Sequence, residues 1–96
     1  MTRRAIVAAN WKMNGDLALV NTMVSGLANV ELQDNVNVVV CPSSPYLSEL
    51  SAQVKTKQLS AAISIGAQNV SEHKQGAYTG EISTQMLQEL SVKFVI

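Results

Sequence analysis

The sequence predicts an α/β domain with a parallel sheet, because apolar strand-like runs alternate with helical patterns along the whole chain. The expected order is β-α-β-α-β-α-β, with no repeat, linker or low-complexity stretch. The 96 residues, of which 47% are hydrophobic and 15% charged, have room for one small domain with an aliphatic core. Alternation of this kind implies right-handed crossovers between parallel strands. Both an open doubly wound sheet and part of a (β/α)₈ barrel satisfy it.

The first strand and the first helix occupy the first third of the chain. Residues 5–9 are a continuous run of small apolar residues, typical of a strand that is buried on both faces. Residues 14–16, Asn-Gly-Asp, supply a turn and a helix cap. Residues at helical spacing then predict an amphipathic helix: Leu17, Val20, Met23, Val24, Leu27 and Val30. A second strand, rich in β-branched residues, is expected at 36–40.

The second half of the chain begins with a helix start. Ser44 is the expected N-cap, and Pro45 takes the first helical position, where its missing N–H costs nothing. The inner stripe of this helix is expected to consist of Leu47, Leu50 and Val54. A third strand is expected at 61–65 and ends at Gly66, and a polar loop at 68–80 is longer than most connections of this type. A short helix is then marked by Met86, Leu87 and Leu90, and a fourth strand by residues 92–96.

Charge and cysteine content exclude several classes of protein. Seven basic residues balance seven acidic ones, so there is no basic excess for binding nucleic acid or an anionic membrane. Cys41 is the single cysteine, which favours a reducing cytoplasm. The apolar run at 5–9 is shorter than a signal-peptide core, and no run approaches the ~18 residues of a membrane helix. We therefore expect a cytoplasmic protein with no nucleic-acid or membrane partner.

The last residues of the sequence are unusual for a chain end. Residues 92–96 read as a buried strand with no turn or polar tail after them, whereas most chains end in a frayed, polar or docked segment. This pattern leads us to expect that the chain is part of a longer protein.

Two polar residues follow the first predicted strand, where ligands bind in parallel α/β folds. Asn10 can donate a hydrogen bond to a substrate oxygen, and Lys12 can neutralise a phosphate or the charge of a developing enolate. The segment has neither the glycine spacing of a dinucleotide fold nor that of a P-loop. On these residues alone, a solvated loop lysine beside a turn-forming asparagine is the favoured interpretation, since most exposed lysines are of this kind.

The other candidate residues give weaker signals. The length of the 68–80 loop indicates a functional segment, and Gly76 and Gly80 suit unusual backbone angles, although a mobile surface loop is the alternative. His73 has no second histidine or cysteine at ligand spacing, so we expect a solvated side chain and no metal. Cys41 has no basic neighbour in the sequence and is expected to be a small buried hydrophobe.

Two segments of the sequence together carry a resemblance to a known family. Residues 10–15 read Asn-Trp-Lys-Met-Asn-Gly, residues 66–69 read Gly-Ala-Gln-Asn, and residues 76–83 read Gly-Ala-Tyr-Thr-Gly-Glu-Ile-Ser. Both the motifs and their separation resemble triosephosphate isomerases, and residues 41–47 fit that family more loosely. The similarity runs over essentially the whole chain and in the same order.

The resemblance implies a (β/α)₈ barrel that interconverts dihydroxyacetone phosphate and D-glyceraldehyde 3-phosphate in glycolysis and gluconeogenesis, without a metal or organic cofactor. By this resemblance Asn10 and Lys12 are substrate-binding residues. Lys12 is also the catalytic residue of this segment, because its ammonium would hold the phosphodianion and stabilise the enediolate.

The family is also a homodimer, and its third loop inserts into the partner subunit. The resemblance therefore implies a dimer interface that includes four residues of this loop: Gln68, Thr79, Gly80 and Glu81. Thr79 would contact the Asn10 region of the partner subunit.

The chain also departs from the family, because a complete barrel takes about 250 residues. Residues 1–96 would be the N-terminal part of a single barrel domain, with the first four strands and three helices. The family's histidine electrophile, glutamate base and phosphate lid lie beyond this segment, so we expect the isolated chain to be inactive. Its open sheet edges predict self-association or partial unfolding.

Two functions from other classes are compatible with the sequence. One is a non-catalytic α/β module that binds phosphate through Lys12 or acts by assembly. The other is an open-sheet nucleotide or response-regulator-like domain. It is disfavoured because the glycine-rich phosphate turn and the acidic cluster of such domains are missing from the sequence.

Overall fold

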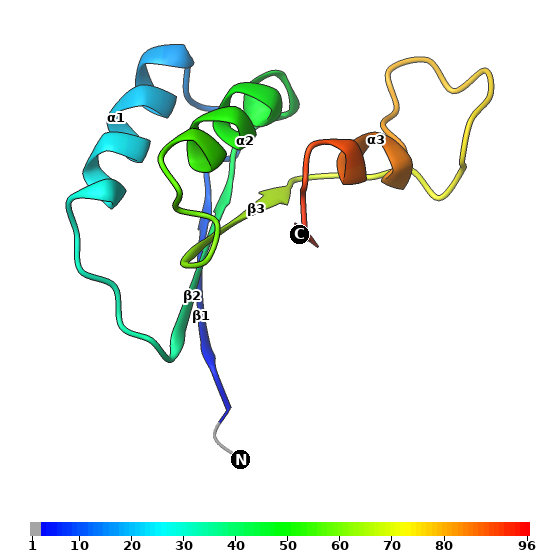
Figure 1. The fold of residues 1–96 in the computed structure, drawn as a ribbon. Helices are drawn as coiled ribbons and strands as arrows, with labels where there is room; N and C mark the ends of the chain where they lie inside the picture. The colour runs from blue at the N-terminus through cyan, green and yellow to red at the C-terminus, as the bar shows by residue number, and fades with distance from the viewer. Residues whose placement is uncertain (1–2) are drawn as a thin grey trace.

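The computed structural model describes residues 3–96, and its elements follow one another in the predicted order (Figure 1). They are β1 (Ala5–Asn10), α1 (Leu17–Ala28), β2 (Val36–Cys41), the 3₁₀ turn η1 (Ser44–Tyr46), α2 (Leu47–Thr56), β3 (Ile63–Ala67), α3 (Thr84–Glu89) and β4 (Phe94–Val95). The strands are parallel and lie in the sheet in chain order, β1-β2-β3-β4. A doubly wound sheet reverses its strand order near the first strand, whereas a barrel keeps it sequential. The described part of the chain is therefore a segment of a (β/α)₈ barrel.

The strand register brings the carboxyl ends of the first strands level with one another. Asn10 at the end of β1 is paired with Cys41 at the end of β2, and Val40 of β2 is paired with Ile65 of β3. The Trp11 N–H continues the ladder by donating to the Cys41 carbonyl over 3.1 Å. The loops that follow β1, β2 and β3 therefore leave the sheet at one edge.

Helices α1 and α2 lie side by side against one face of the sheet (Figure 1). Asp16 caps α1 as expected, because its Oδ1 accepts a hydrogen bond from the Leu19 N–H over 2.8 Å. The predicted stripe of α1 was wrong at both ends. Leu17 is exposed at the first turn, and Val30 is exposed because the helix has already ended at Ala28. The middle of the stripe is confirmed by the burial of Val20 and Val24.

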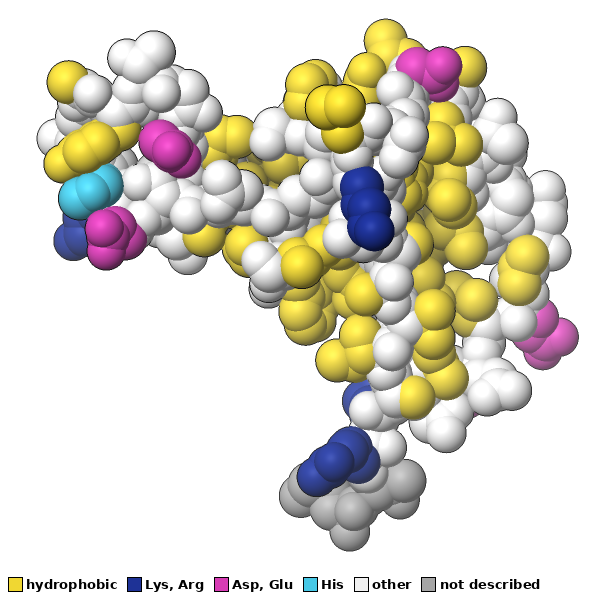
Figure 2. Space-filling model, turned by 180° about the vertical axis from the view of Figure 1, so that it is seen from behind, with side chains coloured by type: hydrophobic (Ala, Val, Ile, Leu, Met, Phe, Trp, Pro, Cys, Tyr) yellow, Lys and Arg dark blue, Asp and Glu magenta, His cyan; other side chains and the backbone are white. Residues whose placement is uncertain are grey.

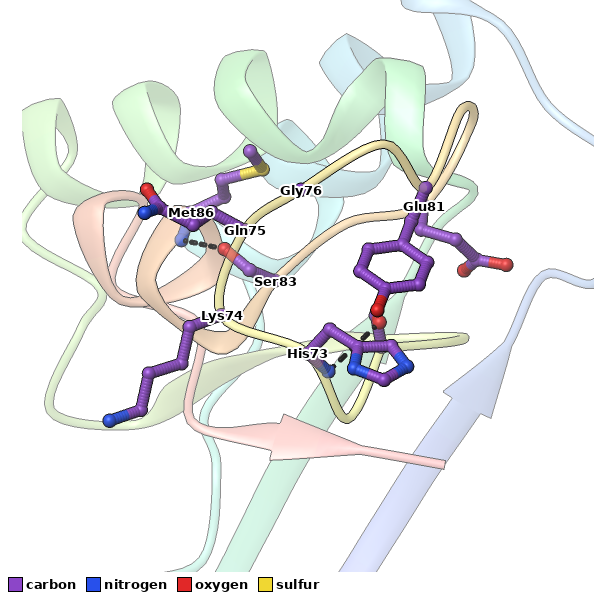
Figure 3. A pocket seen from close by; sticks show the side chains of 9 residues that line it. His73, Lys74, Gln75, Gly76, Glu81, Ser83 and Met86 are labelled. Carbon is purple, nitrogen blue, oxygen red and sulfur yellow. Dashed lines mark hydrogen bonds between the residues drawn. The ribbon is translucent and has the colours of Figure 1, made fainter.

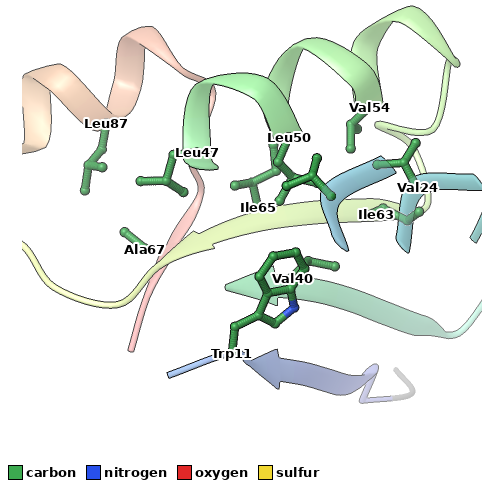
Figure 4. Close-up of a cluster of buried hydrophobic side chains, with 11 residues drawn as sticks. Trp11, Val24, Val40, Leu47, Leu50, Val54, Ile63, Ile65, Ala67 and Leu87 are labelled. Carbon is green, nitrogen blue, oxygen red and sulfur yellow. The ribbon is translucent and has the colours of Figure 1, made fainter. Parts of the chain in front are cut away.

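The core lies between these helices and β2 and β3 (Figure 4). The predicted stripe of α2 is confirmed, because Leu47, Leu50 and Val54 are all buried there. Further members of the cluster are Trp11, Val20, Val24, Val40, Ile63, Ile65, Ala67 and Leu87. Burial of these hydrophobic side chains fixes the distance of α2 from the strands, and with it the position of the loops at the strand ends.

The start of α2 differs from the prediction. Ser44 does not act as N-cap of the α-helix but opens the 3₁₀ turn, and the extended residue before that turn is Ser43. No side-chain hydrogen bond caps either η1 or α2. Pro45 fits the turn because the first N–H groups of a helical segment have no intrahelical partner to lose.

The first strand is far more exposed than predicted. Ile6 and Val7 point to opposite faces of the sheet, and each is 57% exposed, so the expected burial on both faces was wrong. The reason is that β1 is an edge strand, and no element within residues 3–96 covers its first half. Figure 2 shows hydrophobic side chains spread over this side of the molecule, with few charged side chains among them.

The last two strands begin and end at other residues than predicted. β3 starts at Ile63 and includes Gly66, because Ala61 and Ala62 lie in the turn before it. β4 comprises Phe94 and Val95 alone. Before β4, Ser51 of α2 donates a hydrogen bond to the Leu90 carbonyl over 2.6 Å and so ties the end of α3 to α2. None of the helices described within residues 3–96 is long and apolar enough to span a membrane.

Candidate functional site at the strand ends

The ends of β1, β2 and β3 bring together three polar residues from distant parts of the sequence. Lys12 follows β1, Ser43 follows β2 and Gln68 follows β3. Side chains of the latter two donate hydrogen bonds to the Lys12 carbonyl, Gln68 over 3.0 Å and Ser43 over 3.4 Å. The expected candidate Lys12 therefore lies at the carboxyl edge of the sheet, where parallel α/β folds bind their ligands.

The backbone of Lys12 adopts a left-handed conformation, with φ of +57°. Such a conformation costs a residue with a Cβ about 1–2 kcal/mol, so it persists only where the surroundings hold it. The Lys12 N–H donates to Oδ1 of Asn10 over 2.9 Å, and the Lys12 carbonyl accepts from Gln68. The peptide units on both sides of the Lys12 Cα are therefore fixed by side chains.

Gln68 joins the three strand ends through a single amide group. Its Nε2 donates to the Lys12 carbonyl over 3.0 Å and to the Cys41 carbonyl over 2.9 Å. Because both partners are carbonyl oxygens, the amide must present its NH₂ group to them, with one hydrogen for each. The sequence had placed Gln68 at a subunit interface and gave no sign of this link within the chain.

The charge at this edge comes from the Lys12 side chain, which is exposed. Within residues 3–96 no acidic side chain pairs with its ammonium. The Oδ1 of the neighbouring Asn10 is used by the Lys12 N–H, which leaves the Asn10 NH₂ group as a donor. An unpaired cation beside an amide donor suits an anionic ligand, such as a phosphate or an enediolate oxygen.

Cys41 is the last residue of β2, at this edge of the sheet, and its side chain is buried, with 1% of the residue exposed. Burial raises the pKa of its thiol above the ordinary value of 9.0, so the group is a neutral thiol at pH 7. The prediction of a small buried hydrophobe is confirmed. Gly66 leaves the room for it, because a Cβ on Gly66 would lie 2.5 Å from the Cys41 Sγ.

The loop at residues 68–83 extends away from the sheet together with α3 (Figure 1). Gly76 and Gly80 have positive φ values of +136° and +88°, as the sequence predicted. The rings of His73 and Tyr78 are stacked, with centroids 3.9 Å apart and planes 2° from parallel. These side chains line a hollow of about 200 Å³ beside α3 (Figure 3).

Of the four loop residues expected at a subunit interface, Gln68 joins the Lys12 site of its own chain, whereas Thr79, Gly80 and Glu81 make no hydrogen bond to Lys12. Thr79, Gly80 and Glu81 are exposed on the loop. His73 lies near the exposed Glu72, with 3.6 Å between Nε2 and Oε1. Among residues 3–96 no three His, Cys, Asp or Glu side chains come together as a metal site would require.

Two contributors to the site were missed by reasoning from the sequence. Ser43 and Gln68 act through hydrogen bonds to backbone carbonyls 31 and 56 residues away in the sequence. One signal was available for Gln68, since it follows a buried strand directly and a polar residue there faces the ligand edge. Its partner carbonyls could not be identified, because they depend on how three strands are placed side by side.

Comparison with known proteins supports the fold. A family model described as triosephosphate isomerase matches residues 5–96. A triosephosphate isomerase of Colwellia psychrerythraea is 67% identical over 96 residues, covering 100% of this chain and 38% of that protein. Those of Alkalilimnicola ehrlichii and Shewanella denitrificans are 45% and 43% identical, each covering 98% of this chain. The chain thus spans less than two-fifths of the length of these curated relatives. Since the match includes both the strand-end residues and the long loop, the chain belongs to the triosephosphate isomerase family.

Proposed function

We propose that this chain is the N-terminal part of a triosephosphate isomerase, which interconverts dihydroxyacetone phosphate and D-glyceraldehyde 3-phosphate by proton transfer through an enediolate. The observation that carries the proposal is the state of Lys12. Its exposed ammonium has no acidic partner among residues 3–96, and its backbone is held in a left-handed conformation at the carboxyl edge of the sheet.

The chemistry of a triose phosphate explains why a cation is needed there. The substrate carries a phosphodianion, and removal of a proton beside its carbonyl group places negative charge on an oxygen. A cation fixed in advance stabilises this charge without having to reorganise during the reaction. The free NH₂ group of Asn10 adds a donor to the same edge. In the whole protein, Lys12 is thus a catalytic and substrate-binding residue and Asn10 a substrate-binding residue.

Neither of these groups can take the proton from carbon. A protonated amine and an amide are not bases, so the general base and the electrophile must come from the remainder of the barrel. Loss of a positioned base alone lowers a rate by about 10²–10⁴-fold. We therefore propose that the isolated chain has no isomerase activity. From the resemblance to the family, we also propose that no metal or organic cofactor takes part in the reaction of the whole protein.

The proposal is tested in a hybrid protein in which residues 1–96 replace the matching segment of the Colwellia psychrerythraea relative. We expect the hybrid to convert D-glyceraldehyde 3-phosphate and the isolated chain not to. Lys12→Met keeps the length of the side chain and removes its charge, and it should lower kcat/KM of the hybrid by about 10²–10³-fold. Lys57→Met, at an exposed lysine just after α2, is the matched control.

Two results would contradict the proposal. One is full activity of the hybrid with Lys12→Met, measured in a coupled assay with saturating coupling enzyme. The other is turnover by the isolated chain at a rate above that of the same preparation with Lys12→Met.

We further propose that the whole protein is a cytoplasmic homodimer, acts in glycolysis and gluconeogenesis, and uses the loop at 68–83 in its interface. The exposure of Thr79, Gly80 and Glu81 on a projecting loop supports this, as does the position of Gln68 where the loop begins. Thr79→Asp should weaken dimerisation of the hybrid about 10-fold or more, because it buries an unpaired charge. Thr22→Asp, on an exposed position of α1, adds the same charge elsewhere and should leave the dimer intact in sedimentation velocity. Equal dissociation constants for the two variants would contradict the interface.

A non-catalytic role for the isolated chain is favoured by one observation, the free ammonium of Lys12. If the 96-residue chain acts by itself as a phosphate-binding module, inorganic phosphate should shift the amide resonances of residues 10–15. Lys12→Met should abolish these shifts. Absence of any shift in the unsubstituted chain at tens of millimolar phosphate would exclude this role.

A further inference from the structure

We propose that Gln68 is a positioning residue for Lys12: its amide fixes the Lys12 carbonyl and so sets the direction in which the Lys12 side chain leaves the sheet. The inference rests on the proposed function, in which the Lys12 ammonium acts on the substrate. It assigns to Gln68 a role within its own chain that is separate from a subunit interface.

The argument begins with the two peptide units that flank the Lys12 Cα. The unit before it is held through the Lys12 N–H, which donates to Oδ1 of Asn10 over 2.9 Å. The unit after it is held through the Lys12 carbonyl, which accepts from Nε2 of Gln68 over 3.0 Å. The angle between these two units defines φ and ψ at Lys12, and these angles set where Cβ points. Asn10 and Gln68 together therefore determine the direction of the lysine side chain.

Of the two holding residues, Gln68 provides the link to the inner strands of the sheet. Asn10 is the last residue of the edge strand β1 and only two residues from Lys12, whereas Gln68 directly follows β3, which lies between β2 and β4. The residue before it, Ala67, is buried, and its second hydrogen bond goes to the carbonyl of the buried Cys41 over 2.9 Å. Through Gln68, the position of Lys12 is thus fixed relative to β2 and β3.

The chemistry of the side chain explains why glutamine serves here. Its NH₂ group has two hydrogens, and each is used on one carbonyl oxygen. A glutamate of the same shape would present oxygen atoms to two carbonyl oxygens and could not bond to either. A methionine would fill similar space without any donor. Ser43 does not replace the link, because its hydroxyl lies 3.4 Å from the Lys12 carbonyl, at the long end for a hydrogen bond.

The test uses Gln68→Met and Gln68→Glu in the hybrid protein, assayed at concentrations that keep the dimer intact. Both should lower kcat/KM by about 10–100-fold, since an error of about 1 Å in a catalytic group can cost that much. Gln33→Glu, at an exposed position between α1 and β2, adds the same charge and should have no effect. A loss with Gln68→Glu alone would mean that charge matters and not the donors, and it would overturn the proposal.

A double-substitution cycle separates positioning from a merely structural role. If Gln68 acts through Lys12, Gln68→Met should change the activity of the Lys12→Met hybrid less than about 2-fold, because the group that it positions has been removed. A structural defect would instead multiply with the loss caused by Lys12→Met. Additive losses in ΔΔG‡ therefore overturn the proposal. An effect of Lys12→Met without any effect of the Gln68 variants overturns this inference alone, whereas a silent Lys12→Met overturns the proposed function.

If Gln68→Met and Gln68→Glu do not fold, a third variant can test the proposal. Gln68→Asn retains both donors but is one methylene shorter, so it cannot reach the Lys12 and Cys41 carbonyls together. We expect a partial loss of kcat/KM and a weaker intraresidue NOE between the amide proton and Hα of Lys12, which a positive φ makes strong. Unchanged activity and an unchanged NOE would show that the link is not needed.

Discussion

The strand-end site around Lys12 and the loop at 68–83 are organised in opposite ways. The site is held by side chains at the strand ends, chiefly those of Asn10 and Gln68, which hold Lys12 in a left-handed conformation. The loop is organised by contacts between its own residues, chiefly the stacked rings of His73 and Tyr78 and a hydrogen bond from the Glu81 N–H to the Tyr78 carbonyl.

This difference separates two kinds of functional segment. A group that stabilises a transition state must be held in a fixed position, and this is best done by the most rigid part of the fold. The strand ends provide such a support. A segment that binds another surface can project freely, because the partner completes its environment. Substitutions in the sheet should therefore change the position of Lys12 and leave the tip of the loop unchanged. Substitutions in the loop should change the loop and leave Lys12 unchanged.

The larger expected effect comes from filling the space beside the site with Gly66→Ala. The new Cβ would lie 2.5 Å from the Cys41 Sγ and 3.1 Å from Cγ1 of Val39, so these buried side chains, or the strands that carry them, must shift. Overpacking of this kind costs about 1–3 kcal/mol. We expect a lower free energy of unfolding of the hybrid in urea, together with a lower kcat/KM, because Gln68 follows β3 directly.

A compensating change and a matched control sharpen this prediction. Cys41→Ala removes the Sγ that the new methyl group meets, so the double variant should recover most of the lost stability. Gly26→Ala, in α1, has no atom within 4 Å of its added Cβ and should stabilise the protein by about 0.5–1 kcal/mol. If Gly66→Ala is as stable as the unsubstituted hybrid, the close approach of β2 and β3 does not constrain the site.

Much of the scaffold around the site could be predicted from the sequence because local patterns determine it. The 3.6-residue spacing placed Leu47, Leu50 and Val54 in the core, and Asp16 before an apolar stripe marked the start of α1. The sequence also placed Lys12 at the carboxyl edge of the sheet, because it follows the first predicted strand and the carboxyl ends of parallel strands share one edge. In each case the information lies within a few residues of the feature.

The errors concern features that depend on neighbours distant in the sequence. The apolar run at Ile6 and Val7 carries no sign of which strand lies at an edge, so their exposure could not be foreseen. Ser44 was placed at the helix start because a 3₁₀ turn and an α-helix share the same start signals. The role of Gln68 was missed for a related reason, since its partners are backbone carbonyls, which every residue possesses.

The smaller expected effect lies in the loop and follows from His73→Ala. Aromatic pairs contribute about 0.5–1.5 kcal/mol, and we expect the parallel rings of His73 and Tyr78 to contribute no more than this. Removing one ring should loosen the loop before it meets a partner, so the dissociation constant of the hybrid dimer should rise by up to about 10-fold. His73→Phe keeps a flat ring and should retain most of the affinity. At protein concentrations above the dissociation constant of the dimer, kcat/KM should be unchanged for both variants, because His73 donates no hydrogen bond to Lys12. A fall in kcat/KM of the intact dimer with His73→Ala would show that the loop and the strand-end site do not act independently, and it would remove the distinction drawn between them.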